Sequence, residues 1–294
     1  MSHYPAGNLL TAKKHLERAL DLYDPDEHRA PAFIYAFDPK VVCLDYLART
    51  LFPLGLVAQS LRRNEEAIAV ARQTGHRNSL ALPLFFGGTL RQLAGDRDAV
   101  RAIVEELAAL ATEAGFRFWF AGATILRGWV EATGDGLDDG MQVMEAGIAG
   151  WRSSGAEYMV PYFSVLVAQA ELEAGRADAA IPRLQAALQR IERSNERWFE
   201  PEIHRMAGLA RLQLEPDDPG AAEECFDRAL KAARENSARL WELRAAMDLA
   251  SLWLRQRQAA EVRDLLAPIY AGFDAGLDAP DLVRAANLLD ATSS

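Results

Sequence analysis

The sequence has few of the features that mark membrane, disulfide-rich or low-complexity chains. Two cysteines among 294 residues, Cys43 and Cys225, are too few for a disulfide framework. The longest stretches without a charge, 78–90 and 158–170, have 13 residues each, whereas a membrane-spanning helix needs about 20. The 20 glycines and 13 prolines are too few for a disordered chain. No basic region followed by an apolar run marks a secretory signal, so we expect a cytoplasmic protein.

The chain also lacks the basic surface of a nucleic-acid-binding protein. Its 42 acidic residues outnumber 32 basic ones, which gives a net charge of -10. The only adjacent basic pairs are Lys13-Lys14 and Arg62-Arg63. Because a phosphate backbone would be repelled by most of such a surface, we expect no nucleic-acid partner and no membrane partner.

Motifs of catalysis and cofactor binding are missing as well. No Gly-Lys dipeptide occurs, so there is no Walker A phosphate loop, and no G-x-G-x-x-G, G-x-S-x-G or H-E-x-x-H pattern is present. The five histidines are scattered along the chain, and the acidic pairs fall at expected helix starts or on exposed faces. We therefore predict no enzyme activity, no cofactor and no metal.

Small residues recur at a fixed period within apolar, helix-spaced stretches. The intervals between them are 40, 40, 40, 40 and 42 residues. Repeats of this size indicate a solenoid, and small residues suit the points where antiparallel helices approach most closely. These structural anchors are Ala48, Gly88, Gly128, Ala168, Gly208 and Ala250.

Each unit of about 40 residues divides into two helices. Between residues 156 and 195, an apolar run stops at Gly175, and a second run has apolar residues at i, i+3/i+4 and i+7. No window shows the alternation of a half-buried strand. The sequence therefore predicts an all-α solenoid whose helix pairs stabilise one another in series. Residues expected to end the units in a left-handed conformation are Gly75, Gly115, Gly155, Asn195, Asn236 and Gly276.

The register of the repeats also predicts the domain organisation. Residues 1–22 form a truncated first repeat with only its second helix, 23–38 a linker, 39–276 six helix pairs, and 277–294 a C-terminal capping helix and tail. Asp38-Pro39 and Asp218-Pro219 each combine an N-cap residue with a first-turn proline. Since nothing supplies the first helix of the first repeat, we expect the C-terminal part of a longer protein. The alternative is a free-standing repeat protein with a frayed start.

The two-helix unit resembles the tetratricopeptide repeat. The pattern A-x3-[FL]-x2-A occurs at 12–19, 180–187 and 222–229, although the period is 40 residues instead of 34 and most of the usual tryptophans and prolines are missing. The resemblance implies a right-handed α-solenoid of longer helix pairs.

A wider resemblance covers most of the chain. The strings at 15–24, 37–39, 125–129, 196–205, 242–246 and 265–270 are similar to the C-terminal repeat region of bacterial multidomain signalling proteins. In that family a class III adenylate/guanylate cyclase or a regulator domain precedes a P-loop signal-transduction ATPase, and the repeats form the tail. The resemblance implies a sensing or partner-binding arm, with an upstream ATPase or cyclase domain as one partner.

A binding surface is expected on the concave face, which the first helix of each pair lines in tetratricopeptide arrays. Positions counted from the anchors carry aromatic, charged and amide side chains, which suit recognition of a peptide or of another domain's helix or loop. The candidate partner-binding residues are Asp45, Arg49, Phe85, Thr89, Trp129, Tyr162, Gln169, Glu202, Arg205 and Arg244.

Some of these residues have a plain packing interpretation. Asp45 and Arg49 form a common i,i+4 helix pair, and Phe85 and Trp129 could be ordinary interhelix contacts. Trp119 and Trp198 are expected in the core. The strongest candidates for a ligand contact are Tyr162 and the group of Glu202, Arg205 and Arg244. We expect replacement of Arg244 by alanine to weaken partner capture without affecting the fold.

The most favoured function is a non-catalytic interaction and sensing module in bacterial signalling or transcriptional control. It would bind a peptide or partner domain on the concave face, and binding would change the curvature of the superhelix. The alternative is an inducer receptor that encloses a small molecule, with Phe85, Trp119, Trp129 and Tyr162 lining the pocket. Nucleotide hydrolysis or cyclase turnover by the purified chain would contradict both.

Overall fold

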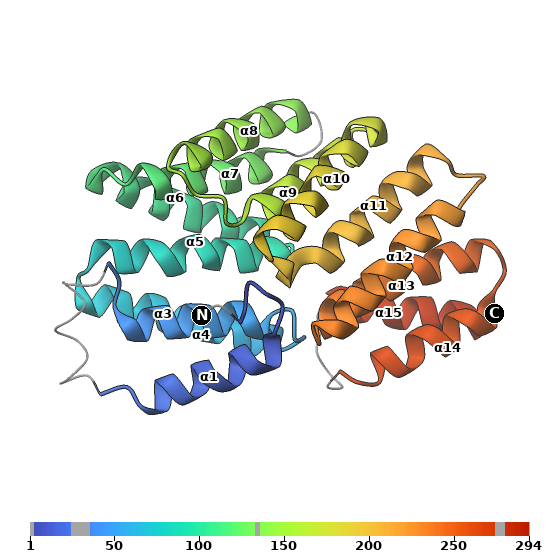
Figure 1. The fold of residues 1–294 in the computed structure, drawn as a ribbon, viewed down its shortest axis with the longest axis horizontal. Helices are drawn as coiled ribbons and strands as arrows, with labels where there is room; N and C mark the ends of the chain where they lie inside the picture. The colour runs from blue at the N-terminus through green and yellow to red at the C-terminus, as the bar shows by residue number, and fades with distance from the viewer. Residues whose placement is uncertain (1–2, 25–35, 133–135, 274–279, 294) are drawn as a thin grey trace.

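A computed structural model describes residues 3–24, 36–132, 136–273 and 280–293, and the fold and site below refer to these residues. They form fourteen α-helices, two short 3-10 helices and no strand, which confirms the predicted all-α solenoid. In Figure 1 the helices follow one another around the molecule from α1 to α15. Their bounds are α1 Leu9–Asp21, α3 Pro39–Leu51, α4 Val57–Thr74, α5 Arg77–Leu93, α6 Arg97–Ala114, α7 Arg117–Glu131, α8 Leu137–Ser153, α9 Val160–Glu173, α10 Ala177–Ser194, η3 Arg197–Phe199, α11 Glu200–Leu214, α12 Gly220–Glu235, α13 Arg239–Arg255, α14 Ala259–Tyr270, α15 Pro280–Asp290 and η4 Ala291–Ser293.

Six helix pairs form the body of the solenoid, from α3/α4 to α13/α14. The first helix of successive pairs begins at residues 39, 77, 117, 160, 200 and 239, so the sequence period is also the period of the structure. Within each pair the two helices pack against each other, and each second helix packs against the next pair. Apolar residues between the pairs form a long core from Tyr4 to Trp241 and a smaller one around α12–α15.

One of the two predicted N-terminal caps is found in the structure. Asp38 accepts hydrogen bonds from the backbone N–H groups of Lys40 and Val41, and Pro39 is the first residue of α3. The second predicted cap is wrong, because α12 begins at Gly220 with Pro219 at the N-cap and no side-chain cap.

The predicted left-handed residues are found in four of the six units. Positive φ angles occur at Gly75, Gly115, Gly155 and Asn195. Asn236, the residue after α12, is right-handed with φ -85°, and the next residue, Ser237, has the positive φ of 56°. Gly276 lies outside the described residues.

The two ends of the solenoid are covered by α1 and α15. Helix α1 buries Leu9, Ala12 and Leu16 and packs against α3, while Leu10 and Leu22 stay more than half exposed. Helix α15 packs against α13 and α14. Most of the predicted linker, residues 25–35, lies outside the described residues, as do residues 274–279 between α14 and α15. The assignment of residues 1–22 to a truncated repeat stays a prediction.

The anchor residues lie where helices approach closely. Ala48, Ala168 and Ala250 have no exposed surface. A Cβ atom built on Gly128 would lie 2.6 Å from the Met144 backbone nitrogen of α8, and one on Gly208 would lie 2.6 Å from the Phe226 ring. Glycine therefore permits a helix spacing at Gly128 that a larger residue would not.

The solenoid closes on itself, so that its first repeats contact its last ones. The Leu240 N–H at the start of α13 donates a hydrogen bond to the Pro53 carbonyl after α3 (3.0 Å), and the rings of Phe52 and Trp241 lie 5.9 Å apart. The segment before α1 takes part as well, because the Pro5 carbonyl accepts hydrogen bonds from the N–H groups of Arg197 and Trp198. This closure leaves little open concave surface along the first helices.

Candidate ligand-binding cavity

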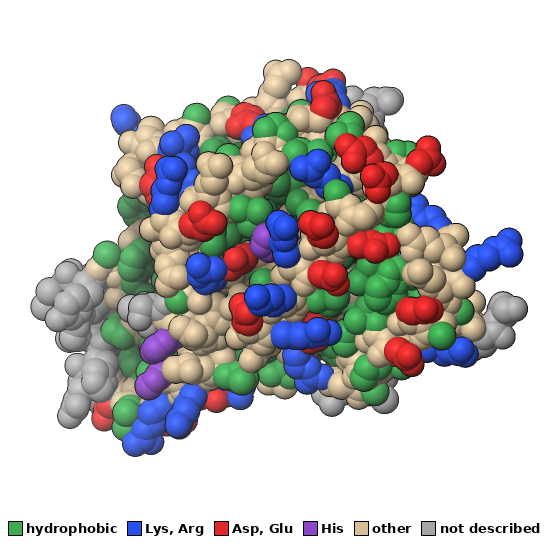
Figure 2. All heavy atoms as spheres, turned by 45° about the vertical axis from the view of Figure 1, so that its right-hand side comes forward, with side chains coloured by type: hydrophobic (Ala, Val, Ile, Leu, Met, Phe, Trp, Pro, Cys, Tyr) green, Lys and Arg blue, Asp and Glu red, His purple; other side chains and the backbone are tan. Residues whose placement is uncertain are grey.

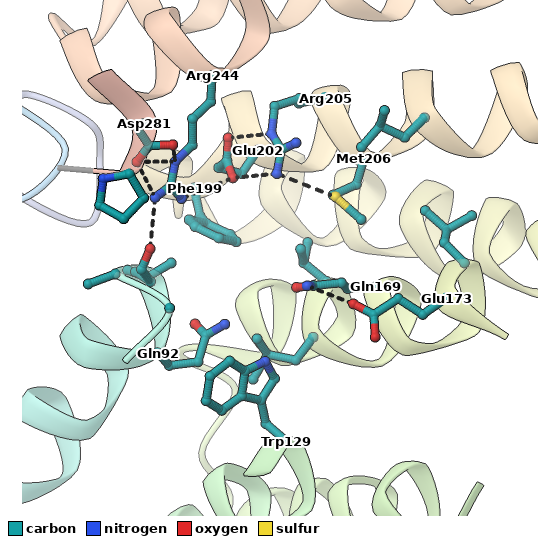
Figure 3. A pocket seen from close by; sticks show the side chains of 18 of the residues that line it. Gln92, Trp129, Gln169, Glu173, Phe199, Glu202, Arg205, Met206, Arg244 and Asp281 are labelled. Carbon is teal, nitrogen blue, oxygen red and sulfur yellow. Dashed lines mark hydrogen bonds and ion pairs between the residues drawn. The ribbon is translucent and has the colours of Figure 1, made fainter. Parts of the chain in front are cut away.

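A cavity of about 620 Å³ lies where the first helices converge, close to the closure. Figure 3 shows side chains from α5, α7, α9, α11, α13 and α15 around it. Its apolar surface comes from residues such as Leu166, Phe199 and Met206, and its polar groups come from opposite walls. A volume of this size is typical of pockets for small ligands or short peptide segments.

One wall is an ion-pair network on α11 and α13. The Arg205 guanidinium donates to both carboxylate oxygens of Glu202 at 2.8 and 3.0 Å, and its remaining nitrogen donates to Asp248 at 2.7 Å. Arg284 of α15 binds the other Asp248 oxygen at 2.7 Å. Glu202 and Asp248 are 3% and 5% exposed, so desolvation strengthens these pairs and makes the loss of one partner costly.

Arg244 joins three distant parts of the chain beside this network. It forms a bidentate pair with Asp281 at the start of α15, with distances of 2.8 to 3.1 Å. The same guanidinium donates to the Leu93 carbonyl at the end of α5 at 2.7 Å. Its third nitrogen lies 3.8 Å from Glu202. Arg244 is therefore held by the closure of the solenoid, and the expectation that its removal spares the fold is not supported by these contacts.

The opposite wall carries amide and indole groups. Gln169 Nε2 donates to Glu173 Oε1 one turn further along α9 (3.1 Å). At the end of α5, Gln92 Oε1 accepts a hydrogen bond from the Tyr162 hydroxyl at 2.6 Å. The indole of Trp129 lies at the cavity with the Arg97 guanidinium 5.2 Å from its ring centroid. Figure 3 shows Gln92 and Trp129 on one side of the cavity and the Gln169–Glu173 pair on another.

The structure divides the ten predicted partner-binding residues into two equal groups. One half lines the cavity: Trp129, Gln169, Glu202, Arg205 and Arg244. The other half is buried elsewhere and offers no surface to a ligand: Asp45, Arg49, Phe85, Thr89 and Tyr162. The expectation that this second group faces an open concave surface does not hold, because these side chains are buried among aromatic residues of neighbouring helices and of the N-terminal segment.

Asp45 and Arg49 form a buried ion pair. Arg49 Nη2 lies 2.6 Å from Asp45 Oδ2, but no aligned hydrogen bond satisfies either carboxylate oxygen. The guanidinium lies 3.7 Å from the ring centroids of both Tyr46 and Phe86 and donates to the Tyr158 hydroxyl at 3.1 Å. Burial raises the pKa of Asp45 to about 6, against the opposing effect of Arg49. This pair packs the interior of the molecule.

Phe85, Thr89 and Tyr162 are also interior residues. The Phe85 ring lies 5.1 Å from Trp151 in an aromatic cluster, and the Thr89 hydroxyl donates to the carbonyl one turn earlier. Tyr162 reaches the cavity only through its hydrogen bond to Gln92. Of the four aromatic residues expected around an enclosed small molecule, only Trp129 lines the cavity, since Trp119 is 5% exposed and packed in the core.

Another buried carboxylate, Glu196, lies where the N-terminal segment packs against the start of the fifth helix pair. Glu196 is 4% exposed and accepts hydrogen bonds from the Met159 backbone N–H (3.0 Å) and the Trp198 indole (3.2 Å). Burial raises its pKa to about 7, although both hydrogen bonds favour the ionised form. The ring of Tyr4, which is 2% exposed, lies 5.4 Å from that of Trp198.

Other reactive groups show no site geometry. Both cysteines are free and partly buried, and burial raises the pKa of each thiol. Burial lowers the pKa of His204 to about 4. His28 lies outside the described residues. In the described part of the chain, no group of three or more His, Cys, Asp or Glu residues could hold a metal ion.

Four polar residues that line the cavity were missed by the sequence analysis: Gln92, Glu173, Gln213 and Asp281. Asp248, which holds Arg205 in the wall, was missed as well. Glu173 lies four residues after Gln169, so its helical spacing was a usable signal. Gln92 is an end-of-helix residue, and Asp281 belongs to the cap, so counting from the anchors could not find them.

The surface and the comparisons give no further assignment. In Figure 2 acidic and basic side chains are interspersed on the face toward the viewer, with hydrophobic side chains visible between them.

Among the helices that the structure describes, none is long and apolar enough to cross a membrane. No model of a known protein family matches the chain, and no curated protein matches it.

Proposed function

We propose that this chain is a non-catalytic recognition module that binds a short peptide segment of a partner protein in the central cavity. The observation that carries the proposal is the cavity itself, where apolar side chains adjoin three side-chain amides from α5, α9 and α11: Gln92, Gln169 and Gln213. Each amide keeps one half of the hydrogen-bonding pattern of a peptide group for a ligand: Gln92 keeps its N–H groups, and Gln169 and Gln213 keep their carbonyl oxygens. A cavity of about 620 Å³ has room for a few residues, so a folded partner would have to present a protruding segment.

The resemblance to bacterial signalling proteins extends this proposal to the biological setting. It supports a cytoplasmic sensing arm whose partner is an upstream ATPase or cyclase domain of the same polypeptide, or a separate regulator. This step depends on analogy to a family, since a fold does not by itself specify a function. Nucleotide hydrolysis or cyclase turnover by the purified chain would contradict the non-catalytic assignment.

A matched pair of substitutions tests whether binding takes place in the cavity. Leu172 lines the cavity, whereas Leu214 is 47% exposed and does not. Peptides selected from a random library displayed on phage are measured by isothermal titration against the parent, Leu172→Trp and Leu214→Trp. We expect Leu172→Trp to weaken binding at least tenfold by filling the cavity, and Leu214→Trp to leave it unchanged.

A small-molecule receptor is the second candidate, and the closure of the solenoid favours it. Contacts such as the Leu240–Pro53 hydrogen bond exclude an extended peptide from most of the concave face, and the cavity volume fits a small ligand. If no peptide is selected and a compound from a metabolite library raises the melting temperature of the parent, the result would support a small-molecule receptor over a peptide-binding module.

In the peptide experiment, equal affinity for the parent, Leu172→Trp and Leu214→Trp would place the peptide site outside the cavity.

A further inference from the structure

The arginine side chains at the cavity are already paired with carboxylates. Arg205 is paired with Glu202 and Asp248, and Arg244 is paired with Asp281 and donates to the Leu93 carbonyl. The third nitrogen of Arg244 faces the Glu202 carboxylate at 3.8 Å. Bidentate pairs of this kind match the guanidinium geometry well. An anionic ligand would have to displace a bound carboxylate and leave it without its partner, which is unfavourable. The two arginines therefore hold the wall together and do not select an anion.

One carboxylate of the cavity, in contrast, has no basic partner among the residues that the structure describes. Glu173 accepts one hydrogen bond from Gln169 through Oε1, and its Oε2 is not used. Three acidic and two basic side chains line the cavity, and both bases are neutralised, so the net charge of the lining is negative. The overall charge of -10 adds to this attraction for a cation.

The other side of the cavity offers hydrogen-bond donors. Because Gln92 Oε1 is taken by the Tyr162 hydroxyl, its amide N–H groups remain for a ligand, and Gln92 is 7% exposed. The Trp129 indole N–H has no hydrogen-bond acceptor within the described ranges. Figure 3 shows Gln92 and Trp129 apart from the Gln169–Glu173 pair. The cavity thus has a donor side and an acidic side, with apolar residues around them.

We infer that the bound peptide segment carries a lysine or arginine whose cationic head pairs with Glu173, while a nearby carbonyl accepts hydrogen bonds from Gln92 and Trp129. Apolar residues next to the basic one contact Phe199 and Met206. This inference rests on the proposed function and specifies the chemistry of the segment.

Peptide pools with one fixed position test this inference without knowledge of the natural partner. Three pools of end-blocked hexapeptides have random flanks and a fixed lysine, glutamate or norleucine. Each pool is passed over the immobilised parent chain, and retention is quantified by mass spectrometry. We expect the lysine pool to be retained about threefold or more over the other two, as one partly exposed ion pair allows.

Three variants test where in the cavity the peptides are recognised. Glu173→Gln keeps the Gln169 contact within reach but removes the charge, and should abolish the preference for lysine. Glu192→Gln is the matched control. Glu192 is exposed on α10, away from the cavity, and its replacement by glutamine changes the net charge by the same amount. Trp129→Phe should lower retention of all three pools by removing the indole donor.

The outcomes separate this inference from the proposed function. Retention of the glutamate pool at or above the level of the lysine pool would overturn the cationic segment and leave peptide binding standing. An unchanged lysine preference in Glu173→Gln would likewise overturn it. If the parent retains no pool at all, peptide binding in the cavity is itself wrong, and the cationic segment is rejected with it.

Discussion

The contact between α7 and α8 at Gly128 gives the sharpest test of the fold. A Cβ atom at this position would lie 2.6 Å from the Met144 backbone nitrogen and 2.7 Å from the Gly140 carbonyl oxygen, both in α8. Because these are backbone atoms, Gly128→Ala can be accommodated only if the two helices move apart by several tenths of an ångström. At the equivalent position of the preceding repeat, a Cβ atom on Gly88 would meet only the ends of the Leu126 and Ile103 side chains.

The expected change in the free energy of unfolding follows from two opposing effects. Alanine in place of glycine favours a helix by about 0.5–1 kcal/mol, and this gain applies to both sites. Overpacking in a close-packed core costs about 1–3 kcal/mol, and it applies in full only where backbone must move. We expect Gly88→Ala to remain within about 1 kcal/mol of the parent and Gly128→Ala to lose about 2 kcal/mol more than Gly88→Ala.

Chemical and thermal unfolding followed by far-ultraviolet circular dichroism measure the difference. Gly128→Ala should melt several degrees below Gly88→Ala, since a loss of about 2 kcal/mol in a chain of this size corresponds to roughly 4–8 °C. Equal melting temperatures for the two variants would refute the close approach of α7 and α8, and with it the register of the repeats.

Two further predictions concern buried charges. Burial raises the pKa of Glu196 from about 4.5 to about 7 on folding. The contribution of Glu196 to stability is therefore full below pH 4.5 and is lost as the pH rises through 7. In urea unfolding from pH 5 to 8, the parent should lose up to about 3 kcal/mol relative to Glu196→Gln, and identical pH profiles would contradict the shift. Arg244→Ala leaves Asp281 and the Leu93 carbonyl without their partner, so the free energy of unfolding should fall by about 1–3 kcal/mol; a variant as stable as the parent would show that these contacts contribute nothing to closure.

Local patterns in the sequence predict the helix pairs well because each pair depends mainly on its neighbours. The anchor spacing and the amphipathic stripes place six pairs at the observed period, and the cap at Asp38 is read directly from Asp38-Pro39. The errors at Asn236 and Asp218 are shifts of one residue at a helix end, where propensity differences are small.

The site is harder to predict because it depends on contacts between distant repeats. The closure through Pro53 and Leu240 has no signature in either segment. The closure brings the Leu93 carbonyl to Arg244. Arg49 and its neighbours, which look exposed when counted from the anchors, are buried in the folded chain. Glu202, Arg205 and Arg244, which were predicted on the concave face, line the cavity, but their mutual pairing could not be read from helix register.

The closure also changes the expected mechanism of signalling. An open solenoid can alter its curvature by small rotations that add up along the array. Here such a change would have to break the Leu240–Pro53 hydrogen bond and separate Arg244 from the Leu93 carbonyl. Arg244 lies in the wall of the cavity and also bridges α5, α13 and α15. A ligand that displaced its guanidinium would therefore loosen the closure itself, whereas one seated between Glu173 and Gln92 would leave it intact.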